Sequence, residues 1–309
     1  MIPPADLLDF LRSEDAFVIA IHLNPDGDAI GSAIALSMAL QKMGKKTVLL
    51  CRDSVPSQYR FLPGRENFYS FDNVLESGVR LRDFRNLILV DCNEISRTGM
   101  EKSKISDVTF GKSAVIDHHE TEKAFGDIRW ILPDIAATGM MIYYLIKALD
   151  IKITEAMAAN LYAALVVDTG NFRFPNTTPE ALSIAAELAG AGANPYMIYK
   201  EINESWTEGR FRLFMKVLNT LTIEDGIAIT YVTRRMFEAT STSPDDTESF
   251  ASVARVMRDI KVAVFLREIG DDNYKVSLRS SDDLNVADIA GFFGGGGHKN
   301  AAGCTIKAD

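Results

Sequence analysis

Short, continuous apolar runs alternate with longer stretches of helical periodicity through the first two thirds of the chain. A short continuous apolar run is typical of a buried strand, and apolar residues recurring about every three to four positions are typical of a helix. Strands are predicted at residues 16–22, 47–51, 86–91 and 113–117, and helices at 28–43, 135–149, 154–167, 178–191 and 195–203. Because continuous apolar strands suit a sheet covered on both faces, we expect a doubly wound, mainly parallel α/β domain with extra helices at its end.

The last third of the chain has a different pattern. One helix is predicted at 205–219, and a hairpin then pairs 221–223 with 227–232 across Asp225-Gly226, a dipeptide that favours a type I′ turn. A helical segment at 250–257 precedes a second hairpin, and the chain ends in an apolar, strand-like segment. The predicted parts are therefore an α/β domain at 1–194, a helical connector at 195–221 and a smaller α+β domain at 222–309.

Composition limits the partners of such a protein. The chain has 309 residues, of which 47% are hydrophobic and 24% charged, which is an ordinary globular composition and long enough for two domains. Lys and Arg number 33 against 42 Asp and Glu, a net charge of −9. An acidic chain is a poor candidate for binding duplex DNA irrespective of sequence. A small anionic substrate stays compatible with this charge, because bound metal ions can invert the local field.

The cellular compartment is predicted from the cysteines and the N-terminus. Three cysteines form no Cys-x-x-Cys pair, which favours a reducing compartment. The first residues lack a basic start followed by an apolar run, and no apolar stretch reaches the roughly 20 residues that span a bilayer. We therefore expect a cytoplasmic protein without a membrane partner.

The chain contains only four histidines, at His22, His118, His119 and His298. Each lies beside an acidic or glycine-rich cluster, at the predicted end of a strand or in a loop, and none lies on the apolar face of a predicted helix. The alternative is that all four are structural or surface residues. Their positions instead favour a role as metal ligands or acid–base groups.

The first acidic cluster follows His22, which ends the first predicted strand. Asp26 and Asp28 come next, in a turn shaped by Pro25 and Gly27. Open α/β sheets bind ligands at the carboxyl ends of their strands, and two carboxylates this close repel unless a cation lies between them. The alternative is that one of the two acids simply caps the following helix.

Three further segments end in acidic residues. Asp91 ends the predicted strand at 86–91, and Asp117 ends the strand at 113–117 and is followed by His118-His119. Asp168 ends an apolar run and is followed by Thr169-Gly170. Asp-Thr-Gly also occurs in aspartic proteases, but that interpretation needs a second triplet or a small all-β homodimer.

Taken together, these segments offer six candidate metal ligands from separate parts of the chain. They are His22, Asp26, Asp28, Asp91, His118 and Asp168. Oxygen and imidazole donors without thiolates favour Mn²⁺, with Mg²⁺ or Zn²⁺ as alternatives. Six ligands are more than one catalytic metal with open positions takes, so the sequence predicts a site for two divalent ions.

A glycine-rich cluster near the C-terminus is the remaining candidate for substrate binding. Its members are Gly294, Gly295, Gly296, Gly297, His298 and Asn300. Consecutive glycines let a ligand approach the backbone and expose N–H groups to an anion, although the spacing is not that of a P-loop. Arg279, followed by Ser280, could supply a guanidinium to a phosphate. The alternatives are a flexible linker and a surface arginine.

These segments together resemble the DHH phosphoesterase family. In chain order they read HLNPDGDAIGS, LVDCNE, IDHH, VVDTGNF and GGGGHKNAAG, and the last is similar to the signature of the DHH-associated C-terminal domain. The resemblance covers roughly residues 15–306. Among the subfamilies, the length is most similar to that of NrnA-type oligoribonucleases, which degrade short RNA and often remove the 3′-phosphate of adenosine 3′,5′-bisphosphate.

The resemblance also implies roles for individual residues. His22 and Asp26 would hold one metal, Asp28 and His118 the other, and Asp91 and Asp168 would bridge or be shared. His119 would face the substrate phosphate, and Asp117 would orient a ligand histidine. Because every position of the metal-binding pattern is present, the resemblance implies an active enzyme.

The expected function is metal-dependent hydrolysis of short single-stranded RNA to mononucleotides, in a cleft between the two domains. One alternative is a phosphatase or phosphodiesterase of another small substrate: adenosine bisphosphate, a cyclic-dinucleotide product, pyrophosphate or polyphosphate. Another is a non-catalytic nucleotide sensor. The oligomeric state is open, with a homodimer as one alternative.

Overall fold

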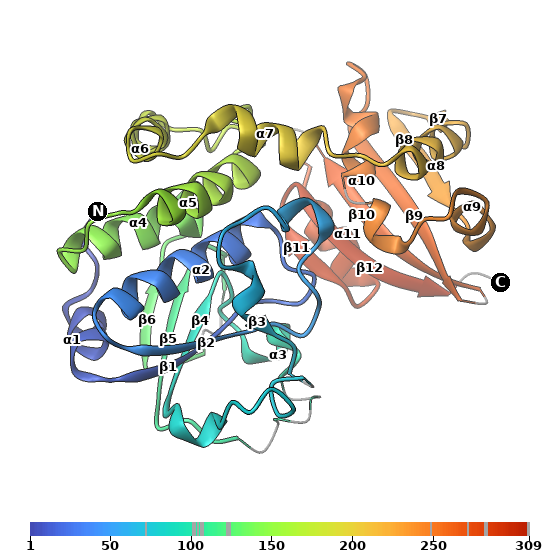
Figure 1. The fold of residues 1–309 in the computed structure, drawn as a ribbon. Coiled ribbons are helices and arrows are strands. Elements are labelled where there is room, and N and C mark those ends of the chain that lie inside the picture. The colour runs from blue at the N-terminus through green and yellow to red at the C-terminus, as the bar shows by residue number, and fades with distance from the viewer. Residues whose placement is uncertain are drawn as a thin grey trace. The chain divides into compact units, whose positions relative to one another are not determined.

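The computed structural model divides the chain into two compact units, Met1–Ser205 and Trp206–Asp309 (Figure 1). It describes residues 1–71, 73–100, 103, 105, 108–121, 125–247, 249–270, 272–280 and 284–307, with the backbone alone at His298. The division falls within the predicted connector.

The first unit is built on a six-stranded sheet in which every strand pair is parallel. Its strands are β1 (Ala16–Ala20), β2 (Lys46–Leu50), β3 (Phe68–Tyr69), β4 (Asn86–Val90), β5 (Lys112–Asp117) and β6 (Ile128–Ile131). The order β3-β2-β1-β4-β5-β6 runs outward in both directions from β1 and β4. Ligand sites of doubly wound sheets lie where the order reverses, which here is between these two strands.

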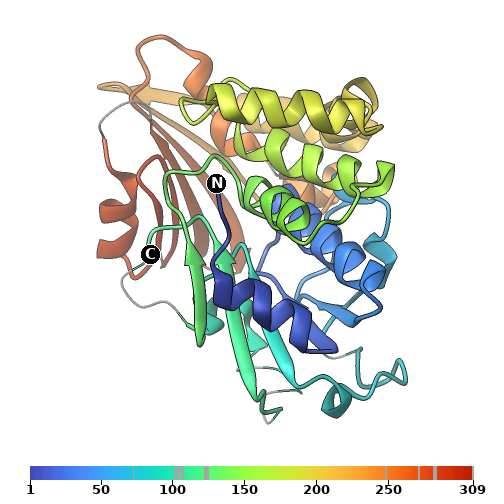
Figure 2. The same ribbon diagram turned by 90° about the vertical axis from the view of Figure 1, so that its left-hand side faces the viewer.

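Helices cover one face of this sheet. They are α1 (Ala5–Ser13), α2 (Gly27–Lys42), α4 (Thr138–Ala148), α5 (Glu155–Asp168), α6 (Pro179–Gly190) and α7 (Pro195–Asn203). Helices α2, α4 and α5 pack on one another over the sheet, and α6 and α7 pack on α5 as an outer layer (Figure 1). Helix α1 lies beside β6 (Figure 2).

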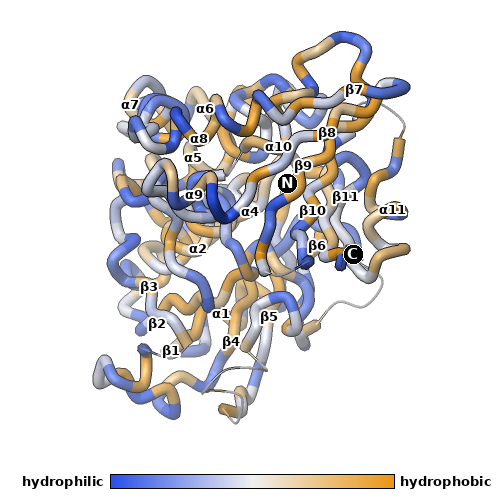
Figure 3. Tube along the Cα trace, turned by 90° about the vertical axis from the view of Figure 1, so that its right-hand side faces the viewer, coloured by the Kyte–Doolittle hydropathy of each residue, from blue (hydrophilic) through white to orange (hydrophobic). Residues whose placement is uncertain are grey.

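The other face is covered by shorter elements. Alternate strand residues, such as Val18 and Leu89, bury their side chains against Phe71, Leu81 and Met100. The covering segments include α3 (Ile95–Thr98) and a 3-10 turn at Leu81–Asp83. Both faces are therefore buried, which explains why the strands read as unbroken apolar runs. Strand β4 is accordingly coloured as hydrophobic, in orange, in Figure 3.

The second unit contains a mixed six-stranded sheet of order β11-β12-β10-β9-β8-β7. Its strands are β7 (Thr222–Glu224), β8 (Ile227–Val232), β9 (Val262–Gly270), β10 (Asn273–Ser280), β11 (Gly296–His298) and β12 (Ala301–Lys307). All pairs are antiparallel except β8 with β9. Asp225 and Gly226 both have positive φ, 48° and 80°, as the predicted type I′ turn requires.

Helices lie on both faces of the second sheet. They are α8 (Glu208–Leu218), α9 (Arg234–Thr240), α10 (Phe250–Val253) and α11 (Val286–Phe292). Helices α8 to α10 pack against Phe265 and Val232 on one face, and α11 packs against Val276 and Leu278 on the other. The predicted fold class, a mainly parallel α/β domain followed by a smaller α+β domain, is thus confirmed.

Both helices of the predicted connector belong to a core. Ile198 of α7 is buried with the first unit's core, whereas Leu213 and Val217 of α8 are buried in the second unit. The segment between these helices, residues 204–207, is short. Among the described residues, no helix is long and apolar enough to cross a membrane.

Candidate active site

The six predicted metal ligands all belong to the first unit and come from five elements. His22 follows β1, Asp91 follows β4, and His118 follows β5. Asp26 and Asp28 lie at the N-terminus of α2, and Asp168 is the last residue of α5. Because parallel strands end at one edge of a sheet, β1, β4 and β5 deliver their residues to the same place.

The turn before α2 gives its two acids different tasks. Asp26 caps its own helix, since its Oδ1 accepts the backbone N–H groups of Asp28 (3.0 Å) and Ala29 (3.1 Å). Asp28 is fully buried and accepts the backbone N–H groups of Thr138 (2.7 Å) and Gly139 (2.9 Å) at the start of α4. The capping alternative is thus correct for Asp26, and Asp28 caps a different helix, but both acids also belong to the cluster.

Asp91 is held in an uncommon backbone conformation. Its φ is +56°, and its N–H donates to the carbonyl oxygen of Ile116 at 2.9 Å, which continues the pairing of β4 with β5. The Thr138 hydroxyl donates to Asp91 Oδ1 at 2.8 Å. Left-handed backbone at a residue other than glycine costs of order 1–3 kcal/mol and often marks a functional site, where the surrounding contacts maintain it.

Backbone carbonyl groups orient two of the histidines. His22 Nδ1 lies 2.8 Å from the carbonyl oxygen of Leu23, and His118 Nδ1 lies 3.0 Å from that of Ile135. A carbonyl oxygen only accepts, so both Nδ1 atoms carry the hydrogen and donate. The Nε2 atoms therefore face the carboxylates, which is the usual arrangement of a metal-binding imidazole.

The imidazoles and carboxylates form three overlapping groups. His22 Nε2 lies 3.4 Å from Asp91 Oδ2. His118 Nε2 lies 3.0 Å from Asp168 Oδ2 and 3.6 Å from Asp91 Oδ1. The groups are His22–Asp26–Asp91, Asp28–His118–Asp168 and Asp91–His118–His119, each with ligand atoms within 4.8 Å of one another.

This donor set fits divalent cations. A neutral imidazole nitrogen facing a carboxylate oxygen at 3.0 Å is repulsive unless a proton or a cation lies between them. Three carboxylates, Asp28, Asp91 and Asp168, surround His118. Oxygen and imidazole ligands at this density are those that Mn²⁺, Mg²⁺ and Zn²⁺ accept. The groups His22–Asp26–Asp91 and Asp28–His118–Asp168 have no residue in common, so the cluster has enough donors for more than one ion.

The surrounding acids favour the protonated form of the two imidazoles. Burial opposes the charge of His22, but its hydrogen bond to Asp91 and the charges of Asp26 and Asp91 outweigh burial and raise its pKa to about 9. Burial likewise opposes the charge of His118, and the hydrogen bond to Asp168 and the charge of Asp91 raise its pKa to about 11. Both rings thus hold protons that a metal ion would replace.

The acids are shifted in opposite directions. Burial raises the pKa of Asp28 well above its usual range, and the charges of Asp91 and Asp168 add to the shift. Burial also raises the pKa of Asp168 to about 6, although the hydrogen bond from His118 opposes this. Burial disfavours the charge of Asp91 too, but His22, His119 and His118 together lower its pKa far below the usual range. Asp91 is therefore the central anion of the cluster.

Asp117 holds His119 beside the cluster. Asp117 Oδ1 lies 2.7 Å from His119 Nδ1 and also accepts the backbone N–H groups of His118 and His119. His119 Nδ1 lies 3.6 Å from Asp91 Oδ1, so His119 belongs to a metal-type group as well. Asp117 Oδ2 is buried with no hydrogen-bond partner among the described residues.

The predicted substrate-binding residues near the C-terminus lie in the second unit. Two of them, Ser280 and Asn300, are hydrogen-bonded to each other. The Asn300 amide donates to Ser280 Oγ at 3.1 Å, and the Ser280 hydroxyl donates to the carbonyl oxygen of Leu284 at 2.7 Å. Ser280 is fully buried. Its hydroxyl therefore holds the end of β10 to the following turn, which differs from the predicted contact with substrate.

The four glycines are not all part of an open loop. Gly296 and Gly297 lie in β11 with His298 and pair with β12. A Cβ on Gly295 would lie 2.1 Å from the Gly303 carbonyl oxygen, and one on Gly297 would lie 2.4 Å from that of Ala301. Close approach to β12 thus requires glycine at 295 and 297, whereas Gly294 and Gly296 meet nothing within 4 Å. All four glycines are exposed, and their predicted contact with an anion stays a prediction.

Arg279 lies in β10, opposite Ala263 and Ala301 on the neighbouring strands. Its Nη1 donates to the carbonyl oxygen of Leu278 at 2.9 Å. Burial lowers the pKa of the Arg279 guanidinium, and the nearby Arg255 lowers it further. Two guanidinium groups near each other are compatible with an anion site, so the predicted contact with phosphate stays a prediction.

Sequence reasoning missed the residues that position the ligands. Thr138 links Asp91 and Asp28 through its hydroxyl and its N–H, and the Ser32 hydroxyl donates to Asp28 Oδ1 at 2.9 Å. The available signal was that Thr138-Gly139 starts a helix whose N-cap residue, Ala137, has no side chain that can cap it. The free N–H groups of such a helix start need an acceptor from elsewhere in the chain.

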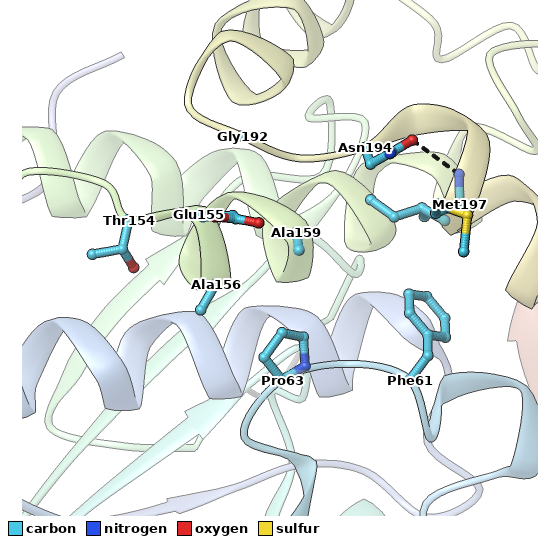
Figure 4. A pocket seen from close by; sticks show the side chains of 10 residues that line it. Phe61, Pro63, Thr154, Glu155, Ala156, Ala159, Gly192, Asn194 and Met197 are labelled. Carbon is cyan, nitrogen blue, oxygen red and sulfur yellow. Dashed lines mark hydrogen bonds between the residues drawn. The ribbon is translucent and has the colours of Figure 1, made fainter.

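A separate apolar hollow of about 440 Å³ lies at the N-terminal end of α5 (Figure 4). Phe61, Pro63, Ala159 and Met197 are among the residues that line it. Asp168 lies at the other end of the 14-residue helix, about 20 Å away at about 1.5 Å per residue. The hollow is therefore not part of the carboxylate–imidazole cluster.

A parallel α/β unit with a carboxylate–imidazole cluster at its switch point defines a class of metal-binding hydrolases. Residues 16–167 match the N-terminal domain of the DHH family, and residues 225–309 match the DHHA1 domain. The chain belongs to the DHH family, whose phosphoesterases are metal-dependent hydrolases of phosphoester bonds. The resemblance carried by the five sequence motifs is thereby confirmed.

Individual relatives match along nearly the whole chain. One is the bifunctional oligoribonuclease and PAP phosphatase NrnA of Thermus thermophilus, 35% identical over 95% of this chain and 85% of that protein. The protein of the same name from Bacillus subtilis is 24% identical over 97% and 92%. The crystal structure of an exopolyphosphatase-related protein from Bacteroides fragilis superposes with a TM-score of 0.91 and 26% identity, over 98% and 91%.

Proposed function

We propose that this chain hydrolyses short single-stranded RNA to mononucleotides and also removes the 3′-phosphate of adenosine 3′,5′-bisphosphate, using two divalent ions, with Mn²⁺ preferred. The observation that carries this proposal is the cluster of three overlapping carboxylate–imidazole groups. The near full-length likeness to bifunctional oligoribonuclease and PAP phosphatases supports the choice of substrate.

Each ion would have its own ligands and share one acid. His22 and Asp26 would hold the first, and Asp28, His118 and Asp168 the second. Asp91 would contact both, because it belongs to the group of His22 and its Oδ1 lies 3.6 Å from His118 Nε2. Bound divalent ions supply Lewis-acid stabilisation of charge on the phosphoryl oxygens and lower the pKa of a water molecule. The protein's contribution is to hold the imidazoles by their Nδ1 hydrogens and to keep Asp91 ionised.

His119 would act on the substrate beside the metal ligands. The 2.7 Å contact of its Nδ1 with Asp117 Oδ1 fixes the ring, because the same carboxylate oxygen is held by two backbone N–H groups. A ring fixed in this way can stabilise a phosphoryl oxygen or deliver a proton to the leaving oxygen. Arg279 and the turn after β11, in the second unit, stay candidates for binding an anion.

The test is a digest of labelled RNAs from a dinucleotide to a strand of several tens of nucleotides, in Mn²⁺, Mg²⁺ or Zn²⁺. Parallel reactions contain adenosine bisphosphate, a linear dinucleotide product of cyclic-dinucleotide cleavage, pyrophosphate or polyphosphate. We expect the shortest RNAs to be hydrolysed fastest, adenosine bisphosphate to lose one phosphate, and Mn²⁺ to support the highest rate.

Two variants make the assignment specific. Asp91→Asn keeps the shape of the side chain but removes the charge shared by two groups, so we expect a loss of at least about 10³-fold in kcat/KM. Asp15→Asn changes an exposed acid that pairs with Lys45 and should leave activity unchanged. Turnover of polyphosphate or pyrophosphate alone would replace the RNA proposal, and full activity of Asp91→Asn would refute the metal assignment.

A further inference from the structure

The segment after Asp168 forms an unusual turn. Gly170, Asn171 and Phe172 all have left-handed backbone, with φ of 56°, 60° and 59°. The Thr169 hydroxyl accepts the Phe172 N–H at 3.1 Å. This conformation is costly for the two residues other than glycine, so the surrounding contacts must maintain it.

The turn is tied back to the metal cluster at its far end. The Asn176 amide donates to the carbonyl oxygens of Asp168 (3.0 Å) and Ala136 (3.1 Å). Residues 169–175 are therefore a loop whose two ends meet at Asp168, itself 3.0 Å from His118.

Phe174 is held at the surface of this loop instead of being buried. Its ring lies against Gly170, where a Cβ would come within 2.4 Å of ring atom Cζ. The side chain nevertheless stays 42% exposed. An aromatic ring that is fixed on one side and open to solvent is the arrangement that base stacking requires. The loop that carries this ring begins directly after Asp168 and is tied back to it by Asn176.

Arg173, which precedes Phe174 in the chain, adds a positive charge to the same loop. Its Nε donates to the Gly170 carbonyl oxygen at 2.7 Å, while the residue as a whole is exposed. Within the described part of the chain, no carboxylate forms an ion pair with Arg173, although the cluster at the start of this loop contains several acids. The remaining guanidinium N–H groups thus have the geometry and the charge to bind a phosphate.

We infer that Phe174 and Arg173 form a nucleotide subsite beside the metal cluster, in which the ring stacks on a nucleobase and the guanidinium binds a neighbouring phosphate. This inference rests on the proposed function and assigns the loop a role within it. The ligand class is a nucleotide with an exposed base and at least one phosphate besides the scissile one.

The stacking half is tested with a 5′-phosphorylated dinucleotide and its analogue that lacks the bases. Phe174→Leu keeps apolar volume against Gly170 but removes the aromatic face, and Phe174→Tyr keeps that face. We expect Phe174→Leu to raise KM about tenfold for the dinucleotide with little change in kcat, and to leave KM of the base-free analogue unchanged. Phe174→Tyr should behave as the wild type. Tyr196→Leu, at an exposed aromatic residue of α7, is the control.

The phosphate half has a matched pair of variants. Arg173→Met should raise KM about tenfold for both the dinucleotide and its base-free analogue, since the phosphates are common to both. Arg129→Met is the control, because Arg129 is also exposed and its Nε also donates to a carbonyl oxygen three residues earlier, that of Gly126 at 2.9 Å.

The outcomes separate this inference from the proposed function. If the wild type does not hydrolyse the dinucleotide, the proposed function fails. If it does, an unchanged KM in Phe174→Leu, or an equal rise with the base-free analogue, overturns the stacking role. An unchanged KM in Arg173→Met overturns the phosphate role. Mn²⁺ should still raise the melting temperature of each variant. If it does not, the substitution has damaged the metal site, and a role of that residue in nucleotide binding alone is overturned.

Discussion

Single side chains in the carboxylate–imidazole cluster each make two kinds of contact. Asp28 accepts two N–H groups of α4 while it faces His118 Nε2 at 3.8 Å. Thr138 donates its N–H to Asp28 and its hydroxyl to Asp91. These hydrogen bonds fix the carboxylates before any cation binds, which lowers the entropic cost of assembling the ligands.

The Thr138 hydroxyl can be removed without changing the shape of the side chain. We expect Thr138→Val to keep the N–H bond to Asp28, to free Asp91 Oδ1 to rotate and to weaken Mn²⁺ binding about 10- to 100-fold. Isothermal titration with Mn²⁺ measures the change. The control is Thr98→Val, which removes another buried hydroxyl, one that donates to the Ile95 carbonyl oxygen and accepts the Met100 N–H. Equal Mn²⁺ affinities in wild type and Thr138→Val would exclude a role for the hydroxyl.

At the scale of elements, the site depends on how closely α2 and α5 approach, because Asp26 and Asp28 start one helix and Asp168 ends the other. Gly31 of α2 faces α5 directly, and a Cβ there would lie 2.3 Å from the Asn160 carbonyl oxygen. Backbone cannot yield as a flexible side chain can, so this contact fixes the distance between the two helices.

A methyl group at Gly31 is therefore expected to push the helices apart. Gly31→Ala should lower the free energy of unfolding by about 1–3 kcal/mol and weaken Mn²⁺ binding as the ligands separate. Gly190→Ala, at the end of α6 with nothing within 4 Å, should be neutral or stabilising by up to about 1 kcal/mol. Urea unfolding of both variants measures the difference, and a Gly31→Ala protein as stable as Gly190→Ala would contradict the close contact.

For the whole molecule, the cluster links stability to pH and to metal. His22 has its pKa raised from 6.5 to about 9, and that of His118 is raised further, so the folded form binds more protons than the unfolded form above pH 6.5. The stabilisation from these rings is fully present below pH 6.5. It is lost as the pH rises through about 9 for His22 and through about 11 for His118. Divalent ions replace the same protons and therefore bind more tightly at high pH.

We accordingly predict opposite trends for the metal-free and metal-bound protein. Between pH 6.5 and 9 the melting temperature in chelator should fall, while the increase caused by saturating Mn²⁺ should grow. Thermal unfolding followed by circular dichroism over this range measures both. In His22→Gln both trends should be weaker. A metal-induced increase that does not vary with pH would contradict the linkage.

Much of the architecture could be predicted from local pattern. Helix α7 has the predicted bounds, and β8 does too, because a Pro at the first helical turn and alternation across a hairpin are local signals. Elements α9 and α11 were missed, since each has only seven residues and too few turns for a clear period. Helix α1 was missed although Leu7, Phe10 and Leu11 have helical spacing.

The sequence by itself determined which carboxylates and imidazoles are candidate ligands and which strand ends carry them. This was possible because an apolar run and the acid that ends it lie within one short segment of the chain. Only the tertiary structure decided which groups meet. His22 faces Asp91, His118 faces Asp168, and Asp28 binds the N–H of Thr138, 110 positions away. Such pairings follow from strand order and from the distance between packed helices, which depend on the whole core and not on any one segment.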